Sequence, residues 1–205
     1  MPEPPINPAE NERDFLVGRV LIAMPSLSEG CFQESVVLIC SHDDDHALGL
    51  ILNKTIGDLT FHQVLQELSI ETAEGAETRP VYFGGPVETK RGAVLHSLDY
   101  RSSTTLALTP SIGMTATKEI MNILAENRGI PRKALLCLGH AGWSAGQLEH
   151  ELASNAWLEG NLSDELLFDA PRETLWQDAL QEIGVDPSMF SQEWVETRDK
   201  DAPLN

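Results

Sequence analysis

Three short apolar runs near the start of the chain constrain the fold more than any other feature. They cover residues 18–24 (GRVLIAM), 35–41 (SVVLICS) and 47–53 (ALGLILN), and turn-forming or acidic residues separate them. Runs of this length that are rich in Val, Ile and Leu are typical of strands near the core of a sheet. The sequence therefore predicts consecutive strands at the beginning of the domain.

Further strands and helices follow without a regular alternation. Short β-favouring runs cover residues 81–87, 92–98, 103–109 and 133–139, and helical periodicity covers residues 57–68, 115–129, 146–158 and 170–184. A doubly wound fold would alternate strand and helix throughout. The pattern instead predicts an α+β fold, a single domain with a strongly bent mixed sheet and flanking helices.

Capping residues suggest where two of these helices begin. Asp58 or Thr60 can cap the first helix, and Asp169 with Pro171 can begin the last one, which ends at Gly184. Residues 1–14 hold several prolines and no apolar period, so we expect a flexible arm before a domain of residues 15–192. Residues 193–205 read as a polar tail.

The charge of the chain limits the classes of partner. Of its 205 residues, 32 are Asp or Glu and 14 are Lys or Arg, which gives a net charge of −18. Such a field repels phosphate backbones and anionic membrane surfaces, so direct nucleic acid binding is not expected. A small molecule or a protein partner fits better.

Two further features indicate the compartment. The apolar runs are too short to cross a bilayer, so no membrane association is expected. Cys31, Cys40 and Cys137 form no CxxC motif, and two of them stand in apolar runs. We expect a cytoplasmic protein.

A Gly-x-Ser-x-Gly motif at residues 142–146 raises the possibility of a hydrolase. It stands between a predicted strand and a predicted helix, as a nucleophile elbow requires. In that fold the acid and the histidine follow the serine, yet the last histidine, His150, comes only six residues after Ser144. A structural strand-to-helix corner is favoured, and only an unrelated fold with another residue order would make Ser144 a nucleophile.

The polar residues after this motif can be placed on a helix. Glu149 and Glu151 lie about 200° apart around a helix, so they do not form a local pair of carboxylates. Gln147 and Glu151 stand at i and i+4 and can interact. Their polar edge is either functional or a set of partners for neighbouring loops.

Possible metal ligands gather in one segment. Residues 41–46 (SHDDDH) combine two histidines with three aspartates, but the spacing matches no calcium loop. A solvated acidic turn between strands is favoured over weak metal binding. His140 and His150 make no zinc spacing with the cysteines, so no metal site is predicted.

Two glycine-containing segments suggest close backbone contacts. Residues 83–87 (FGGPV) and 139–143 (GHAGW) place glycines beside apolar strands, where backbone passes closely or adopts positive φ. We expect two loops there, which either expose N–H groups to a ligand or are simply demanding turns around a buried tryptophan. Nothing resembles a Walker loop or a dinucleotide motif, so no cofactor is predicted.

The motifs taken together resemble a known family. Residues 20–27 with Phe32, residues 47–53, 83–87 and 92–97, and above all AGWSAGQLEHEL at 141–152 followed by NAWL at 155–158, are similar to the AlgH/YqgE family. The resemblance runs from about Phe15 to about Gly184. It implies a compact α+β domain with a β pseudo-barrel, and a family name linked to alginate regulation without an established biochemical activity.

The resemblance also bears on single positions. The family pattern is Gly-Trp-x-x-Gly-Gln-Leu-Glu, so position 144 is variable and Ser144 looks incidental. This chain has His140 where the family commonly has tyrosine, SEGC before Phe32 where an Asp-Pro is common, and no Gly-His-Ala near its end. These departures argue against a tyrosine-like role at position 140 and against a role for the carboxy-terminal tail.

These observations lead to three hypotheses of function. The first is a regulatory or binding protein whose cleft holds turn glycines and polar side chains at the ends of elements. The second is an enzyme that acts through Gln147, Glu149 or Glu151, with His140. The third, a transcription factor that binds DNA directly, is opposed by the charge. The residues predicted for the cleft are Asn53, Gly84, Gly85, Pro86, His140, Gly142, Trp143, Gln147, Glu149 and Glu151.

Overall fold

The computed structural model describes residues 15–27, 30–73 and 79–190. The arm expected over residues 1–14 and the tail expected over residues 193–205 lie outside these ranges. In the described part of the chain, no helix has both the length and the apolar character needed to cross a membrane.

Within the described residues, ten strands form one curled sheet. Their bounds are β1 Val20–Ala23, β2 Val36–His42, β3 His46–Ile51, β4 Thr55–Thr60, β5 Pro80–Phe83, β6 Val87–Ser97, β7 Leu106–Ala107, β8 Ile112–Thr115, β9 Ala134–Ser144 and β10 Trp157–Gly160. The main order is β10-β1-β2-β3-β9-β6-β8-β7, and β5 joins β4 to β9. The β5–β9 pair is parallel, whereas the other pairs are antiparallel. The predicted α+β fold with a bent mixed sheet is confirmed: the sheet curls into a half-barrel.

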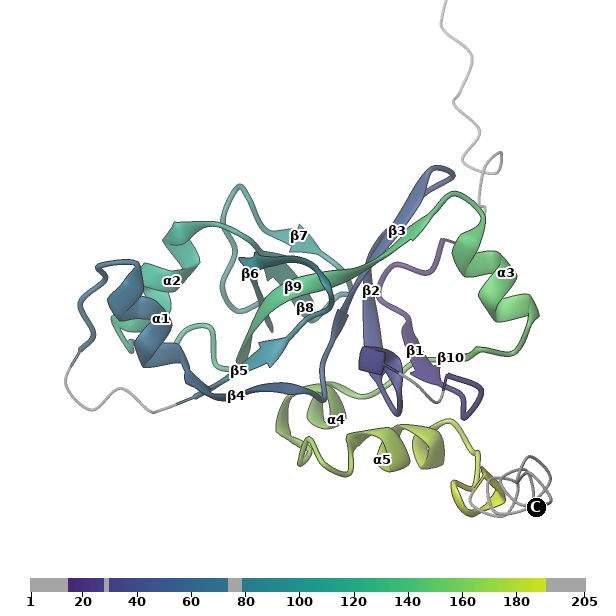
Figure 1. Ribbon diagram of the computed structural model, residues 1–205. Helices are drawn as coiled ribbons and strands as arrows, with labels where there is room; N and C mark the ends of the chain where they lie inside the picture. The colour runs from purple at the N-terminus through teal and green to yellow at the C-terminus, as the bar shows by residue number, and fades with distance from the viewer. Residues whose placement is uncertain (1–14, 28–29, 74–78, 191–205) are drawn as a thin grey trace, which may run out of the picture.

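Helices flank this sheet on several sides. Their bounds are η1 Gly30–Phe32, α1 Phe61–Glu67, α2 Lys118–Ala125, α3 Gln147–Ala153, α4 Asp164–Asp169 and α5 Leu175–Glu182. Figure 1 shows α1 and α2 together at one end of the molecule, α3 at the other end, and α4 and α5 along the lower edge of the sheet. The half-barrel with its flanking helices is a single domain.

Strand β9 holds the two parts of the sheet together. Its first half, through Leu138, lies between β5 and β6, and its last four residues pair with β3. Between these halves Gly139 has φ 74°, which redirects the strand. Strand β9 therefore belongs to both parts of the curled sheet.

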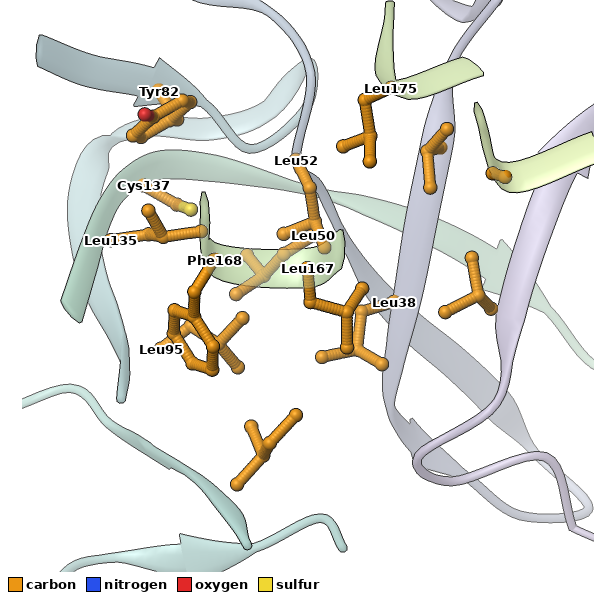
Figure 2. Packing of buried hydrophobic residues seen from close by; sticks show 14 of the residues in the cluster. Leu38, Leu50, Leu52, Tyr82, Leu95, Leu135, Cys137, Leu167, Phe168 and Leu175 are labelled. Carbon is orange, nitrogen blue, oxygen red and sulfur yellow. The ribbon is translucent and has the colours of Figure 1, made fainter. Parts of the chain in front are cut away.

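The largest core cluster lies between the sheet and helices α4 and α5. Figure 2 shows Leu167 and Phe168 of α4 packed toward Leu38, Leu50 and Leu95 of the sheet. These five side chains are at most 8% exposed. Two smaller clusters lie under α3 and under α1 with α2. Burial of both strand faces explains why the first three strands read as unbroken apolar runs.

The three strands predicted at the beginning of the domain are confirmed as β1, β2 and β3. The helix predicted from residue 57 is correct only from Phe61, because residues 55–60 form strand β4 against β5. Of the two predicted caps, Thr60 is the N-cap, and it forms a reciprocal capping box with Gln63. The helix predicted over residues 115–129 is the shorter α2.

Two predictions around the Trp143 motif are wrong. Residues 139–143 are not a loop, because Ala141, Gly142 and Trp143 pair with β3 and β9 continues to Ser144. The helix predicted through residue 158 ends at Ala153. Asn155 then has φ 55°, and the following residues pair with β1 as strand β10.

The predicted start of the last helix is also wrong. Asp169 is the final residue of α4, and its carboxylate lies 2.7 Å from Lys133 Nζ. Thr174 is the N-cap of α5. Pro171 lies between α4 and α5, and the last helix therefore begins later than the sequence predicts.

Candidate functional site

Three glycines fix the crossing of β9 and the β5–β6 turn. A Cβ on Gly85 would lie 2.1 Å from the carbonyl carbon of His140, and one on Gly139 would lie 2.3 Å from the carbonyl oxygen of Gly85. A Cβ on Gly84 would meet Gly139 at 2.3 Å. Gly84 N–H also donates to the Leu138 carbonyl at 2.8 Å. The close backbone passage predicted from the sequence is therefore present, and each backbone fills the space beside the other.

Glu151 organises the tryptophans at the end of β9. Its Oε2 accepts hydrogen bonds from Nε1 of Trp143 at 2.9 Å and Nε1 of Trp157 at 2.8 Å. Its Oε1 accepts one from Gln147 Nε2 at 2.9 Å. The two indole rings meet edge to face at 6.0 Å, and Phe32 packs beside them. The predicted contact between Gln147 and Glu151 is confirmed, and this carboxylate satisfies donors inside the fold.

Ser144 has a comparable structural partner. Its N–H and its hydroxyl donate to Gln147 Oε1 at 3.1 and 3.2 Å. An amide oxygen cannot remove a proton from a hydroxyl, so this contact does not activate a nucleophile. The N-cap of α3 is Gly146 rather than Ser144, so Gln147, the first residue of the helix, links the helix start to the end of β9.

Glu149 is held on the opposite side of α3 from Glu151. Its Oε1 lies 2.8 Å from Nε2 of His42, whose Nδ1 accepts the N–H of Leu16 at 3.1 Å. The hydrogen of a neutral His42 ring therefore lies on Nε2. The Glu149 backbone N–H lowers the pKa of its own carboxyl group, and the hydrogen bond from His42 acts in the same direction. The sequence places His42 only in an acidic turn. In the structure it is the last residue of β2 and bonds Glu149 of α3.

The acidic turn itself connects β2 and β3. Asp43 Oδ1 accepts the N–H groups of Asp45 and His46, each at 2.9 Å, and these bonds lower the pKa of Asp43. This is a side-chain-capped hairpin turn, as the favoured interpretation predicted. No group of three metal-ligating side chains occurs among the residues placed in the structure.

The remaining predicted site residues lie at two places. His140 is half-exposed on β9, and a Cβ added to Gly142 would lie 3.8 Å from its Cδ2. Pro86 is exposed in the turn between β5 and β6. Asn53 follows β3, and its side chain accepts the Val36 N–H at 2.9 Å and donates to the Glu34 carbonyl at 2.7 Å. A shared ligand for the ten residues stays a prediction.

A groove of about 640 Å³ lies beside α5, away from these residues. Its walls come from the chain after β1, the chain after η1, helix α5 and the segment after α5. Its lining includes Met24, Leu27, Gln33, Glu34, Trp176, Gln177, Gln181, Asp186 and Phe190. The volume falls within the range of ligand sites in proteins.

Trp176 forms the aromatic part of the groove. Its Nε1 donates to the Ala23 carbonyl at 2.8 Å, which fixes the ring against the end of β1. The Phe190 ring lies 6.5 Å from it, centroid to centroid. Both side chains are half-buried, so part of each remains open to solvent. The result is a rigid apolar surface in a hollow.

Two carboxylates line the groove. Glu34 has φ 50°, a left-handed conformation, and Asn53 binds its carbonyl oxygen. Asp186 accepts the Ser188 N–H at 2.9 Å, and this bond lowers the pKa of the Asp186 carboxyl group. Asp186 is therefore ionised at neutral pH. Asn53, a predicted site residue, thus supports the groove through the chain before β2.

Two other hollows are less suited to a ligand. One of about 90 Å³ lies between α1 and β5 near Phe61 and Tyr82. The other, about 510 Å³, lies near Arg132 and Lys133. Each of these cations already has an acidic partner: Arg132 pairs with Asp99 at 3.1 Å and Lys133 with Asp169. The groove beside α5 is the candidate functional site.

Fold and sequence now define the class of this protein. A single α+β domain with a curled sheet, with the Gly-Trp-x-x-Gly-Gln-Leu-Glu motif at the junction of β9 and α3, matches the AlgH-like family model over residues 20–188. The chain belongs to the AlgH-like family. The resemblance inferred from the sequence motifs is confirmed.

Relatives and solved structures agree with this assignment. A UPF0301 protein of Jannaschia sp. is 42% identical over 180 residues, covering 87% of this chain and 93% of the relative. One of Caulobacter vibrioides is 39% identical over 177 residues, with 86% and 91% covered. The solution structure of the AlgH protein from Pseudomonas aeruginosa superposes with a TM-score of 0.72 at 34% identity, covering 89% and 96% of the two chains. A Corynebacterium diphtheriae protein shares the fold, with a TM-score of 0.66 at 22% identity, and 85% and 90% covered.

Proposed function

We propose that this protein is a binding protein that holds a segment of a partner protein in the groove beside α5. The observation that carries the proposal is the combination of a fixed aromatic surface with hydrogen-bonding side chains in one hollow. Trp176 and Phe190 supply apolar surface, while the amides of Gln33, Gln177 and Gln181 supply donors and acceptors. Ligand sites in proteins combine these two elements.

The shape of the groove favours a chain segment over an enclosed small molecule. Several of its lining side chains are exposed, among them Gln33, Gln177 and Gln181. Small-molecule sites commonly bury most of the ligand surface, whereas peptide-binding grooves leave one side of the bound chain exposed. A regulatory role would then consist of holding a partner and would require no chemical step.

Two expectations from the sequence accompany this proposal. Cys31, Cys40 and Cys137 are free thiols, which fits a reducing, cytoplasmic location. The net charge of −18 favours a protein partner over nucleic acid. Mobility-shift measurements with duplex DNA at low salt are therefore expected to show no binding below micromolar concentrations.

A peptide-display selection tests the proposed function. Random peptides are selected on the wild-type chain and then measured on Gln181→Tyr, which narrows the groove without changing charge. The matched control is Gln66→Tyr, on the exposed side of α1 at the other end of the molecule. Selected peptides are expected to lose at least about tenfold in affinity on Gln181→Tyr, which corresponds to ~1.4 kcal/mol.

The control determines how the result is interpreted. Peptides that keep their affinity on Gln66→Tyr and lose it on Gln181→Tyr support the groove. If every selected peptide binds both variants equally well, the groove is not the binding site and the proposal fails.

A further inference from the structure

The ionisable groups of the groove carry one sign of charge. Glu34 lies on one wall and Asp186 on another, while no Lys or Arg occurs among the described residues that line it. The whole chain carries −18, so its long-range field also attracts cations. A positively charged segment would be drawn toward this surface and would meet carboxylates within it.

Helix α5 presents two amides with a regular spacing. Gln177 and Gln181 are four residues apart, both are exposed and both line the groove. Four residues of helix rise by about 6 Å. Two residues of extended chain span roughly 6.5 Å, so the amides match the repeat of backbone groups along one edge of an extended peptide. Side-chain amides can donate to a carbonyl and accept from an N–H, as such a backbone requires.

Apolar side chains line the same groove as these polar groups. Met24, Leu27, Trp176 and Phe190 line the same hollow, and all four are half-buried. In an extended peptide, neighbouring side chains point to opposite sides. A segment that alternates or mixes apolar residues with Lys or Arg could therefore place the former on Trp176 and the latter near the carboxylates.

From these three features we infer that the groove binds an extended segment of a partner protein in which Lys or Arg flanks apolar residues. The inference rests on the proposed function and names the chemistry of the partner. The amides of α5 bind the backbone, Trp176 and Phe190 contact the apolar residues, and Glu34 with Asp186 selects the cationic ones. Recognition of this kind gives affinity through backbone bonds and specificity through side chains.

Fluorescence anisotropy with three labelled peptides tests this inference. The probes are Gly-Arg-Leu-Val-Leu-Lys-Gly, the same peptide with Gln at both charged positions, and the same peptide with Glu there. We expect the order Arg/Lys, then Gln, then Glu, and a loss of affinity for the first peptide as salt is raised. The Glu34→Gln/Asp186→Asn double variant should bind the Arg/Lys peptide about fivefold more weakly, as expected for two solvent-exposed ion pairs.

Matched controls separate local charge from total charge. Glu67→Gln/Asp58→Asn removes one Glu and one Asp charge at exposed positions on α1 and on β4, the strand that leads into α1. It should leave the affinity within about twofold, because salt screens charges outside the groove. Asp186→Asn keeps an oxygen that can accept the Ser188 N–H, so the double variant is expected to fold.

The outcomes distinguish this inference from the proposed function. If the Glu peptide binds as tightly as the Arg/Lys peptide and both lose affinity on Gln181→Tyr, the charge inference is overturned while the groove stands. If the Arg/Lys peptide binds equally well to wild type, to the double variant and to Gln181→Tyr, both are overturned.

Discussion

The indole nitrogen of Trp143 donates a 2.9 Å hydrogen bond to Glu151, a residue eight positions later on the next helix. The same carboxylate oxygen accepts the Trp157 indole N–H, so one acidic side chain joins β9, α3 and β10. With a third donor from Gln147, this carboxylate accepts three hydrogen bonds within the protein, and we expect it to stabilise the fold. Its removal tests whether the motif that identifies the family has a structural role.

Glu151→Ala should destabilise the protein by about 2–4 kcal/mol. Both indole N–H groups would lose their acceptor, and leaving such groups unpaired costs about 1–3 kcal/mol each when buried. Urea denaturation measures the loss. Glu173→Ala, at an exposed position, is the matched control and should change the free energy of unfolding by less than about 0.5 kcal/mol. Equal effects of the two substitutions would contradict the anchoring role.

Trp143→Ala and Ser144→Ala should differ strongly in stability. Trp143 is 5% exposed within a core cluster, so loss of its ring should cost about 3–5 kcal/mol. Ser144 is exposed and bonds only Gln147 among its described side-chain partners, so its loss should cost no more than about 1–2 kcal/mol. Chemical denaturation of both variants makes the comparison. Catalytic turnover that disappears in a stably folded Ser144→Ala protein would contradict the structural role of this serine.

Gly85→Ala should prevent stable folding or cost at least about 3 kcal/mol. Its Cβ would lie 2.1 Å from backbone atoms of β9, and neither backbone can move without breaking the sheet. Gly142→Ala on β9 is the control, because a Cβ there meets only ordinary contacts at 3.7 Å or more. Thermal melting that shows the same midpoint for both variants would refute the interlocked crossing.

Protonation of His96 on unfolding should contribute to the pH dependence of stability. This ring is fully buried between the Ser97 carbonyl and the Thr115 hydroxyl, and burial lowers its pKa. The unfolded chain binds a proton at a pKa near about 6.5, so acid favours unfolding. The free energy of unfolding should therefore fall as pH decreases from 7 to 5, and less steeply in His96→Gln. Nearby Asp99 has a lowered pKa and stays ionised over this range. The same slope in both proteins would show that His96 is not responsible.

The sequence predicts the early strands well because each strand can be recognised from its own residues. β1, β2 and much of β3 are buried on both faces, so nearly every side chain is apolar. It predicts a helix that includes α1, with Asp58 or Thr60 as its cap, for a similar reason, since the observed cap Thr60 and its partner Gln63 are three residues apart.

The errors fall where distant pairing determines the structure. Gly142 and Trp143 look like a loop, but β3, almost a hundred residues earlier, pairs with them. Trp157 continues a helical pattern in the sequence, but in the structure it pairs with Ala23 of β1 as part of strand β10. The secondary-structure propensity of a segment does not indicate which distant strand pairs with it.

The groove was not predicted from the sequence for the same physical reason. Trp176 and Ala23, whose hydrogen bond fixes one wall, are 153 positions apart. The Gln177 and Gln181 spacing was readable, but amides four residues apart occur on many exposed helix faces. Only the packing of α5 against the end of β1 makes them part of a hollow.

Mapping a bound peptide onto the protein by NMR tests the central claim most directly. Titration of the Gly-Arg-Leu-Val-Leu-Lys-Gly peptide into ¹⁵N-labelled protein should shift the Trp176 indole signal and the amide signals of Met24, Gln177 and Gln181. Signals of Gly142 and Glu151, at the family motif, should stay unchanged. Shifts at Gly142 and Glu151 with none beside α5 would contradict the account and return the binding site to the cleft predicted from the sequence.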